Sequence, residues 1–242
     1  MRPWNSIEID ECGEPLLPFF EEFLCLEPHP YLSLGAPYGE NMHPWYLRSG
    51  VIDRLLIAQK YLSFDSSGLQ LAVFDSWRPI PVQAFMVKYS IDEQCSKRGI
   101  KVEDENYTER LQEVIDDVNR FWAVPTLDPL SPPPHSTGAA IDLTLADELG
   151  NPLDMGGEID FIGDASLPNY FQFVPTLNRS ANELLFNFRR SLLYKCMNKA
   201  GFSQHPNEWW HFSYGDQLWG WVNNSQKAIY GGVSIDNNEE TL

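Results

Sequence analysis

The sequence predicts a single α+β domain in which most strands pair in antiparallel fashion. Two short apolar runs, at 69–75 and 140–145, have the length and composition of strands, and helical periodicity occurs around them. The strands are not joined by regular crossover helices, which disfavours a doubly wound parallel sheet. No glycine-rich phosphate loop follows either run, so a nucleotide-binding fold is disfavoured as well.

The two predicted strands differ in their side-chain pattern. LQLAVFD (69–75) is typical of a buried strand, and the prolines of the following DSWRPIP turn the chain because proline cannot donate to a sheet ladder. AIDLTL (140–145) alternates strictly, so Asp142 shares one face with Ala140 and Thr144 while the aliphatic side chains share the other.

Helical spacing of apolar residues recurs in four segments, and the last of them is followed by Gly201 at a position where helices commonly end. The predicted helices span 51–62, 82–96, 108–122 and 182–200. Residues 146–180 are rich in loop signals, and 202–214 are expected to return as strand and loop.

The remaining segments flank this domain. Residues 1–50 are rich in proline and aromatic side chains, which predicts an irregular extension packed on the domain, either covering a cleft or mediating association. Residues 51–222 are expected to form the catalytic domain, and 223–242 a polar, mobile tail.

Composition limits the classes of partner. The chain of 242 residues carries 17 basic and 34 acidic side chains, a net charge of −17, which repels phosphate backbones and anionic lipids. We therefore expect neither nucleic acid nor membrane as a partner and interpret the acidity as a source of solubility. The four cysteines form no C-x-x-C pair, which favours reduced thiols over a disulfide framework.

The N-terminal segment lacks the pattern of a secretory signal. Glu8, Asp10 and Glu11 interrupt any apolar stretch there, and no later run reaches the ~18 consecutive apolar residues of a membrane span. We expect a cytoplasmic protein. The sequence gives no indication of its oligomeric state.

Two motifs together predict a zinc site. In HSTGAAID, His135 and Asp142 offer an imidazole and a carboxylate, although alone they also fit a loop histidine and a hydrogen-bonded strand aspartate. In EWWH, Glu208 and His211 equally fit a solvated acid beside a core histidine. Combined, two histidines and one carboxylate leave a fourth zinc position open, and Glu208 beside them can move protons, as hydrolysis requires.

Two further charged residues are candidates. Arg78 in DSWRP could stabilise an oxyanion, or could instead form an ordinary salt bridge with Asp75. In LDMGGEID, Asp154 or Asp160 could hold a substrate ammonium, or could be a solvated loop acid.

The other histidines, the serines and the cysteines have weaker claims to a catalytic role. His29, His43 and His205 each lie close to a proline in a loop, and we interpret them as structural. The serines near these motifs lack a nucleophile elbow, so a serine triad is not supported. No cysteine lies in a recognisable catalytic context.

Four motifs follow one another along the chain: DSWRP at 75–79, HSTGAAIDLTL at 135–145, LDMGGEIDF at 153–161 and NEWWHFSYGDQ at 207–217. In this order they resemble the D-alanyl-D-alanine dipeptidases, a family of zinc D,D-peptidases that includes the VanX-type enzymes of vancomycin resistance. The resemblance runs from about Val51 to Trp221. It implies a small α+β domain around a central, mainly antiparallel sheet flanked by helices.

The resemblance also implies roles for single residues. His135, Asp142 and His211 match the ligands of one Zn²⁺ per chain, and Glu208 matches the catalytic acid and base. Arg78 matches the arginine that stabilises the tetrahedral intermediate, and Asp160 resembles the acid that meets the amino group of a small D,D-dipeptide.

One position departs from the family pattern. The family places a serine two residues before the first zinc histidine, where it helps to position the amino end of the substrate. Here that position is Pro133. Two alternatives to a dipeptidase stay open: a D,D-carboxypeptidase that acts on peptidoglycan stem peptides, and a non-catalytic binding module with a zinc site.

Overall fold

A five-stranded sheet forms the centre of the computed structural model, which describes residues 2–39, 42–172 and 180–233. β3 runs parallel to β5, and the other neighbouring strands run antiparallel. The predicted α+β fold with a mainly antiparallel sheet is thus confirmed. The strand order is β3 (Leu24–Cys25), β5 (Gln70–Asp75), β6 (Ala140–Ala146), β8 (His211–Ser213) and β7 (Ser203–Gln204).

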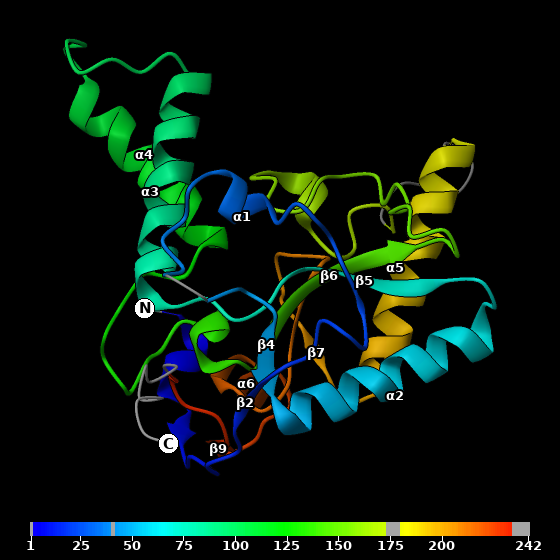
Figure 1. Cartoon of the computed structure of the whole chain (residues 1–242). Helices are drawn as coiled ribbons and strands as arrows, with labels where there is room; N and C mark the ends of the chain where they lie inside the picture. The colour runs from blue at the N-terminus through cyan, green and yellow to red at the C-terminus, as the bar shows by residue number, and fades with distance from the viewer. Residues whose placement is uncertain (1, 40–41, 173–179, 234–242) are drawn as a thin grey trace.

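Two long helices, α2 (Ser49–Asp65) and α5 (Ala181–Lys199), pack against each other and cover one face of the sheet (Figure 1). The aliphatic side chains of β6 lie in the same buried cluster as the apolar stripes of these helices. α5 begins at a capping box, in which Ser180 and Glu183 satisfy each other's backbone N–H groups. Burial of this apolar face is the main stabilising contribution to the domain.

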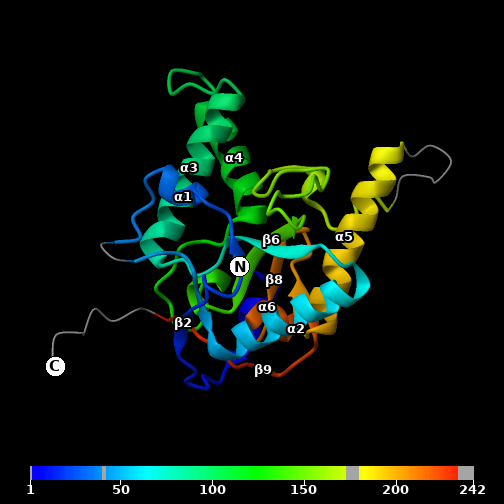
Figure 2. The same ribbon diagram turned by 45° about the vertical axis from the view of Figure 1, so that its right-hand side comes forward.

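A helical hairpin of α3 (Ile80–Lys97) and α4 (Tyr107–Phe121) projects from the body of the molecule (Figures 1 and 2). Its base packs on the short helix α1 (Pro30–Ser33) in a second apolar cluster, which includes Tyr31 and Trp122. α3 begins two residues before the predicted start because Pro81 fits the first turn of a helix, where its missing N–H costs nothing.

The N-terminal extension contains more regular structure than its composition predicts. Besides β3 and α1 it holds the 3₁₀ helix η1, and β2 pairs antiparallel with β4. Strands of two or three residues are too short to show a period of two, and their partners are remote in sequence. The added elements are η1 (Pro3–Ser6), β1 (Glu8–Ile9), β2 (Leu16–Pro18) and β4 (Tyr46–Arg48).

The prediction of a mobile tail is wrong for residues 223–233. After α6 (Gln217–Val222), strand β9 (Lys227–Ala228) pairs in parallel with β1. Tyr230 is buried, and its hydroxyl donates to Glu14 at 2.7 Å. Isolated apolar residues in a polar stretch give no periodic signal, although they can anchor it. Residues 234–242 lie outside the described part of the chain.

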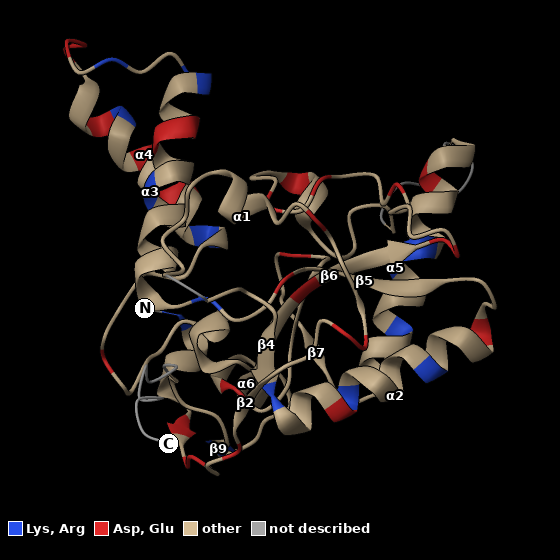
Figure 3. Cartoon of the chain, viewed as in Figure 1, with Lys and Arg blue, Asp and Glu red and all other residues tan. Residues whose placement is uncertain are grey.

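Acidic side chains occur both on the projecting α3–α4 hairpin and on the main body (Figure 3). The excess of negative charge is therefore spread over the molecule. Within the described residues, no helix combines the length and the apolar character needed to cross a bilayer.

Candidate active site

Strand register aligns three polar residues across the sheet, on the face that α2 and α5 leave uncovered. Asp75 of β5 lies opposite Asp142 of β6, and Asp142 lies opposite His211 of β8. A register shift between Val73 and Asp75 brings Asp75 into this row. Residues paired across a sheet point to the same side, so the ladder itself places Asp142 beside His211.

His135 reaches this row through a tight turn. It lies in the 3₁₀ helix η2 (Pro134–Thr137), which ends at Gly138 with φ +69°. A Cβ at Gly138 would lie 2.4 Å from the Leu16 side chain, so only glycine combines this backbone conformation with this close approach. The turn leads directly into β6 and brings His135 to within contact of Asp142.

The ligand atoms of three buried residues converge. His135 Nε2 lies 3.2 Å from Asp142 Oδ2, His211 Nδ1 lies 3.0 Å from Asp142 Oδ1, and the two imidazole nitrogens lie 3.1 Å apart. The three residues are only 4%, 2% and 4% exposed. The structure therefore brings together the three residues that the sequence predicts as metal ligands.

The arrangement suits a tetrahedral zinc ion. Zinc–nitrogen distances of ~2.0–2.1 Å place neighbouring ligand atoms about 3.3 Å apart, close to the three separations seen here. His135 Nδ1 donates to the Ser76 carbonyl at 2.6 Å, which leaves the lone pair of Nε2 directed at the site. Asp142 Oδ1 is buried and accepts no well-directed hydrogen bond from the described residues, and His211 Nδ1 at 3.0 Å is itself a candidate ligand atom, as expected where both bind one cation.

The electrostatics of Asp142 agree with this interpretation. Burial raises the pKa of Asp142, but His135 and His211 lower it by more, so its pKa lies well below the usual range. The residue is thus held as a carboxylate, the form that coordinates a metal.

Glu208 lies beside the three convergent residues without joining them. It belongs to the connection between β7 and β8, and its Oε2 lies 3.7 Å from His211 Nδ1. Oε1 is buried with no hydrogen bond in the described part of the chain. Burial and the charge of Asp142 raise the Glu208 pKa well above the usual range, although Arg2 and Arg78 oppose them. A basic carboxylate beside a cation site is suited to accept a proton.

Arg78 is fixed in one orientation. Its Nε and Nη2 donate to Asp75 Oδ2 at 3.0 and 2.5 Å, and its Nη1 donates to Gln83 at 2.8 Å. Nη2 also lies 3.5 Å from Asp142 Oδ2. Burial lowers the Arg78 pKa, but Asp75 and Asp142, together with the neighbouring tyrosines, raise it by more, so the guanidinium stays charged. Arg78 therefore forms the salt bridge with Asp75 and also lines the cavity, so the two roles considered for it do not exclude each other.

His29 carries a role that its sequence context does not reveal. Its Nε2 lies 3.1 Å from Asp75 Oδ1, and its Nδ1 accepts from the Tyr31 backbone N–H. His29 thus orients the carboxylate that orients Arg78. The interpretation of His29 as structural agrees with this, but the partner is 46 residues away and could not be named from local sequence.

Asp160 and Asp154 occupy different environments. Asp160 lines the same cavity as the metal ligands and accepts a hydrogen bond from the Tyr31 hydroxyl at 2.7 Å. Its φ of 64° is left-handed, a conformation that aspartate tolerates better than most residues. Burial, with help from Asp142, raises the Asp160 pKa to about 7. Asp154 is exposed and accepts from the Gly156 N–H, outside this cavity.

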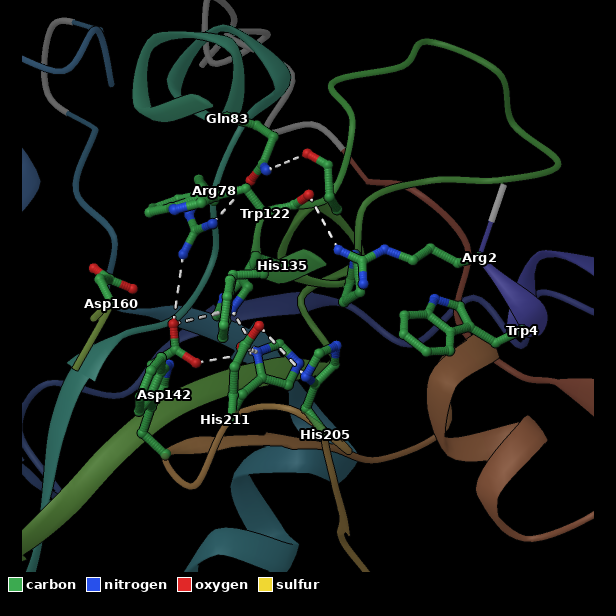
Figure 4. Close-up of a pocket in the computed structure, with 15 residues that line it drawn as sticks. Arg2, Trp4, Arg78, Gln83, Trp122, His135, Asp142, Asp160, His205 and His211 are labelled. Atoms are coloured by element: carbon green, nitrogen blue, oxygen red, sulfur yellow. Dashed lines mark hydrogen bonds and ion pairs between the residues drawn. The ribbon is translucent and has the colours of Figure 1, made fainter. Parts of the chain in front are cut away.

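The cavity has a second wall that sequence reasoning missed. Arg2 and Trp4 line it together with Trp122 and His205 (Figure 4). His205 is buried, with Nδ1 3.4 Å from Glu208 Oε1, and burial lowers its pKa well below the usual value. His205 therefore contributes to the site as a neutral ring, beyond the structural role expected of it. No motif marks Arg2, because it reaches the cavity only through folding.

Comparison with known proteins identifies the family. A model of the D-Ala-D-Ala dipeptidase family matches residues 26–229. The chain belongs to the D-Ala-D-Ala dipeptidase family. The predicted resemblance and the prediction of a peptidase are thus confirmed.

Two curated members of the dipeptidase family are similar to this chain. The D-alanyl-D-alanine dipeptidase of Synechocystis sp. is 45% identical over 240 residues, covering 96% of each chain. The D-alanyl-D-alanine dipeptidase of Escherichia coli is 31% identical over 146 residues, covering 60% of this chain and 55% of its own. Among solved structures, a mutant of the vancomycin resistance D,D-pentapeptidase VanY in complex with Zn(II) aligns with a TM-score of 0.46 and 13% identity, covering 93% of this chain and 96% of its own.

In this dipeptidase, Pro133 is a buried backbone element. It precedes η2, and its carbonyl accepts from the Ser136 N–H at 2.9 Å. Pro134, not Pro133, lines the cavity. The hydroxyl that the family pattern places here is thus absent.

Proposed function

We propose that this chain is a zinc peptidase that hydrolyses D-Ala-D-Ala, or a closely related D,D-dipeptide, to free amino acids. The observation that carries the proposal is the convergence of His135, Asp142 and His211 beside Glu208, whose Oε1 has no hydrogen bond within the described residues. Purely structural zinc sites are closed by four protein ligands and need no such base. Family membership supports the choice of substrate.

In this proposal, His135, Asp142 and His211 hold one zinc ion per chain. Bound zinc supplies Lewis-acid chemistry, since it polarises a carbonyl and makes water acidic near neutral pH. Glu208 accepts the proton of the attacking water and passes it to the leaving amine. Arg78, fixed by Asp75 and Gln83, donates to the oxyanion that forms at the scissile carbonyl.

Asp160 is proposed to receive the ammonium group of the substrate. It lies at the edge of the cavity, where the Tyr31 hydroxyl holds one of its oxygens. An acid that lines the same cavity as the metal ligands selects a substrate whose free amino end lies close to the scissile bond. This favours a dipeptide over a longer stem peptide. The division into residues 1–50, 51–222 and 223–242, and a cytoplasmic location, stay predictions.

The decisive experiment measures release of D-alanine from D-Ala-D-Ala. Metal-replete protein is expected to release it, and removal of the metal by a chelator is expected to abolish release until zinc is restored. A protein that contains one zinc per chain yet releases no D-alanine would refute the proposal. A pentapeptide ending in D-Ala-D-Ala tests the alternative, because equal or better cleavage of it would favour a D,D-carboxypeptidase.

Glu208→Gln separates metal binding from proton transfer. Because general acid–base catalysis contributes ~10²–10⁴-fold, kcat should fall by that factor while zinc content stays at one per chain. Zinc content is measured by metal analysis of the dialysed protein. Turnover that survives the substitution would show that Glu208 is not the base. A zinc-loaded wild type without any turnover would instead favour the non-catalytic zinc module.

A further inference from the structure

The cavity has two positively charged side chains in its described lining, Arg78 and Arg2. Arg78 is oriented by Asp75 and Gln83, which accept from all three of its nitrogens, and its remaining N–H groups are assigned to the oxyanion. Its charge is largely balanced by Asp75 and directed at the reaction centre. A second anionic group in the cavity would therefore need another cation.

Arg2 has no acidic partner within ion-pair distance among the described residues. Its Nη1 and Nη2 instead donate to two backbone carbonyls at the end of α4, those of Arg120 at 2.9 Å and Trp122 at 3.1 Å. Carbonyl oxygens orient a guanidinium without neutralising it. The side chain is half-buried and lines the cavity, so its positive charge faces the substrate space, where Glu208 attracts it without coming within ion-pair distance.

Aromatic contacts hold this segment in place. Trp4, two residues further on, is 6% exposed and packs edge-on against His205, with ring centroids 5.4 Å apart, and against Trp221 at 5.8 Å. Arg2 itself lies 5.3 Å from the centroid of the Trp4 ring. The N-terminal 3₁₀ helix is thus anchored in the wall of the cavity and presents Arg2 from a defined position.

The charges of the cavity are arranged in order. Asp160 lies at one side, His135, Asp142 and His211 lie in the middle, and Arg2 lies at the other side (Figure 4). A free dipeptide has the same order of charge: an ammonium, a scissile carbonyl and a carboxylate. Bound with its ammonium at Asp160 and its carbonyl at the metal ligands, it directs its carboxylate toward Arg2.

We propose that Arg2 binds the C-terminal carboxylate of the substrate and thereby restricts cleavage to a bond next to a free C-terminus. The inference rests on the proposed function and deepens it, since it names the group that receives the leaving residue. Arg2 precedes residue 26, where the match to the family model begins. It would act as a specificity residue that holds none of the transferred protons, and its charge acts on the base Glu208 only from a distance.

The experiment compares two substrates, D-Ala-D-Ala and D-Ala-D-alaninamide, which differ only in the negative charge at the C-terminus. Protein with a purification tag at its C-terminus keeps the N-terminal segment native. In Arg2→Gln, KM for the free acid should rise ~10- to 100-fold with kcat little changed, because a hydrogen bond to a charged group is lost. The preference for acid over amide should fall by the same factor, and Arg2→Lys should restore part of it.

Arg120→Gln is the matched control. The Arg120 side chain is exposed and outside the cavity lining, and only its backbone carbonyl contacts Arg2. Removing this neighbouring charge should leave the preference for acid over amide unchanged.

Three results would overturn the inference in different ways. If Arg2→Gln lowers kcat/KM equally for acid and amide, Arg2 merely tethers the N-terminal segment. If neither value changes, Arg2 does not contact the substrate. If the metal-replete wild type cleaves neither substrate, the proposed function fails and the inference fails with it, whereas the first two results leave the proposed function intact.

Discussion

The two walls of the cavity are built by different means. On the first, Asp142 and His211 project from paired strands, and a two-residue link joins η2, which carries His135, to β6. On the second, Arg2 and Trp4 are held by side-chain contacts to backbone carbonyls and aromatic rings. A sheet ladder fixes the backbone of its residues, while side-chain contacts fix only the groups that touch and leave the backbone of the segment less constrained.

This difference separates chemistry from selectivity. A metal site needs ligand atoms placed within a few tenths of an ångström, which a sheet can supply. Recognition of a charged end tolerates looser placement, since electrostatic attraction falls off slowly with distance. Substitutions on the sheet wall should therefore abolish turnover, and substitutions on the other sides of the cavity should change substrate preference or pH dependence.

The largest loss of activity is expected from substitutions on the wall of the cavity that the paired strands form. Asp142→Ala removes the ligand that contacts both histidines, and zinc affinity should fall by at least ~100-fold, more than the loss of an outer partner causes. Turnover should fall to background. Metal analysis and D-alanine release measure the two effects. Asp154→Ala, which removes an exposed acid outside the cavity, should change neither. Retained zinc in Asp142→Ala would contradict the assigned ligand set.

Arg78→Lys should give the next largest effect. Lysine keeps the charge but cannot donate to Asp75 and Gln83 with the same fixed fork, so kcat should fall ~10²–10³-fold while KM changes little. Arg190→Lys is the matched control, since Arg190 is also buried and donates to the carbonyls of Met155 and Leu167, away from the metal ligands. It should lower the melting temperature without lowering kcat. Equal kcat losses in both variants would assign Arg78 a purely structural role.

The smallest effect is expected at Asp160 and depends on pH. Its pKa of about 7 in the folded chain exceeds the unfolded value of ~3.9, so the folded chain binds a proton that the unfolded chain has released. The free energy of unfolding should therefore fall as pH rises from about 4 through about 7, by up to about 4 kcal/mol. In Asp160→Asn this contribution should disappear. Urea unfolding at pH 5 and pH 8 measures it.

The same substitution tests substrate binding. Only the ionised carboxylate attracts an ammonium, so KM of the wild type should rise as pH falls below about 7, and KM of Asp160→Asn should be ~10-fold higher at pH 8 with a flatter pH profile. Asp154→Asn is the control for both measurements. An unchanged KM in Asp160→Asn would exclude this residue from the site of the substrate ammonium.

Much of the fold could be predicted because its elements carry strong local patterns. The four helices have apolar stripes. AIDLTL alternates strictly, and this pattern alone predicts that Asp142 lies on the face opposite the aliphatic side chains. The short strands β1, β2 and β9 were missed because two or three residues carry no period. Their pairing depends on partners far away in the sequence, such as Arg48 for Leu16.

Two motifs of the sequence, and their order along the chain, are enough to predict the groups of the zinc site: two imidazoles, a carboxylate and a neighbouring base. Only the tertiary structure decided which groups surround them. His29 behind Asp75, Tyr31 against Asp160, and Arg2 in the cavity wall all come from segments that no local pattern links to the site. The physical reason is that ligand chemistry resides in single side chains, whereas a cavity is formed by packing between residues that are distant in sequence.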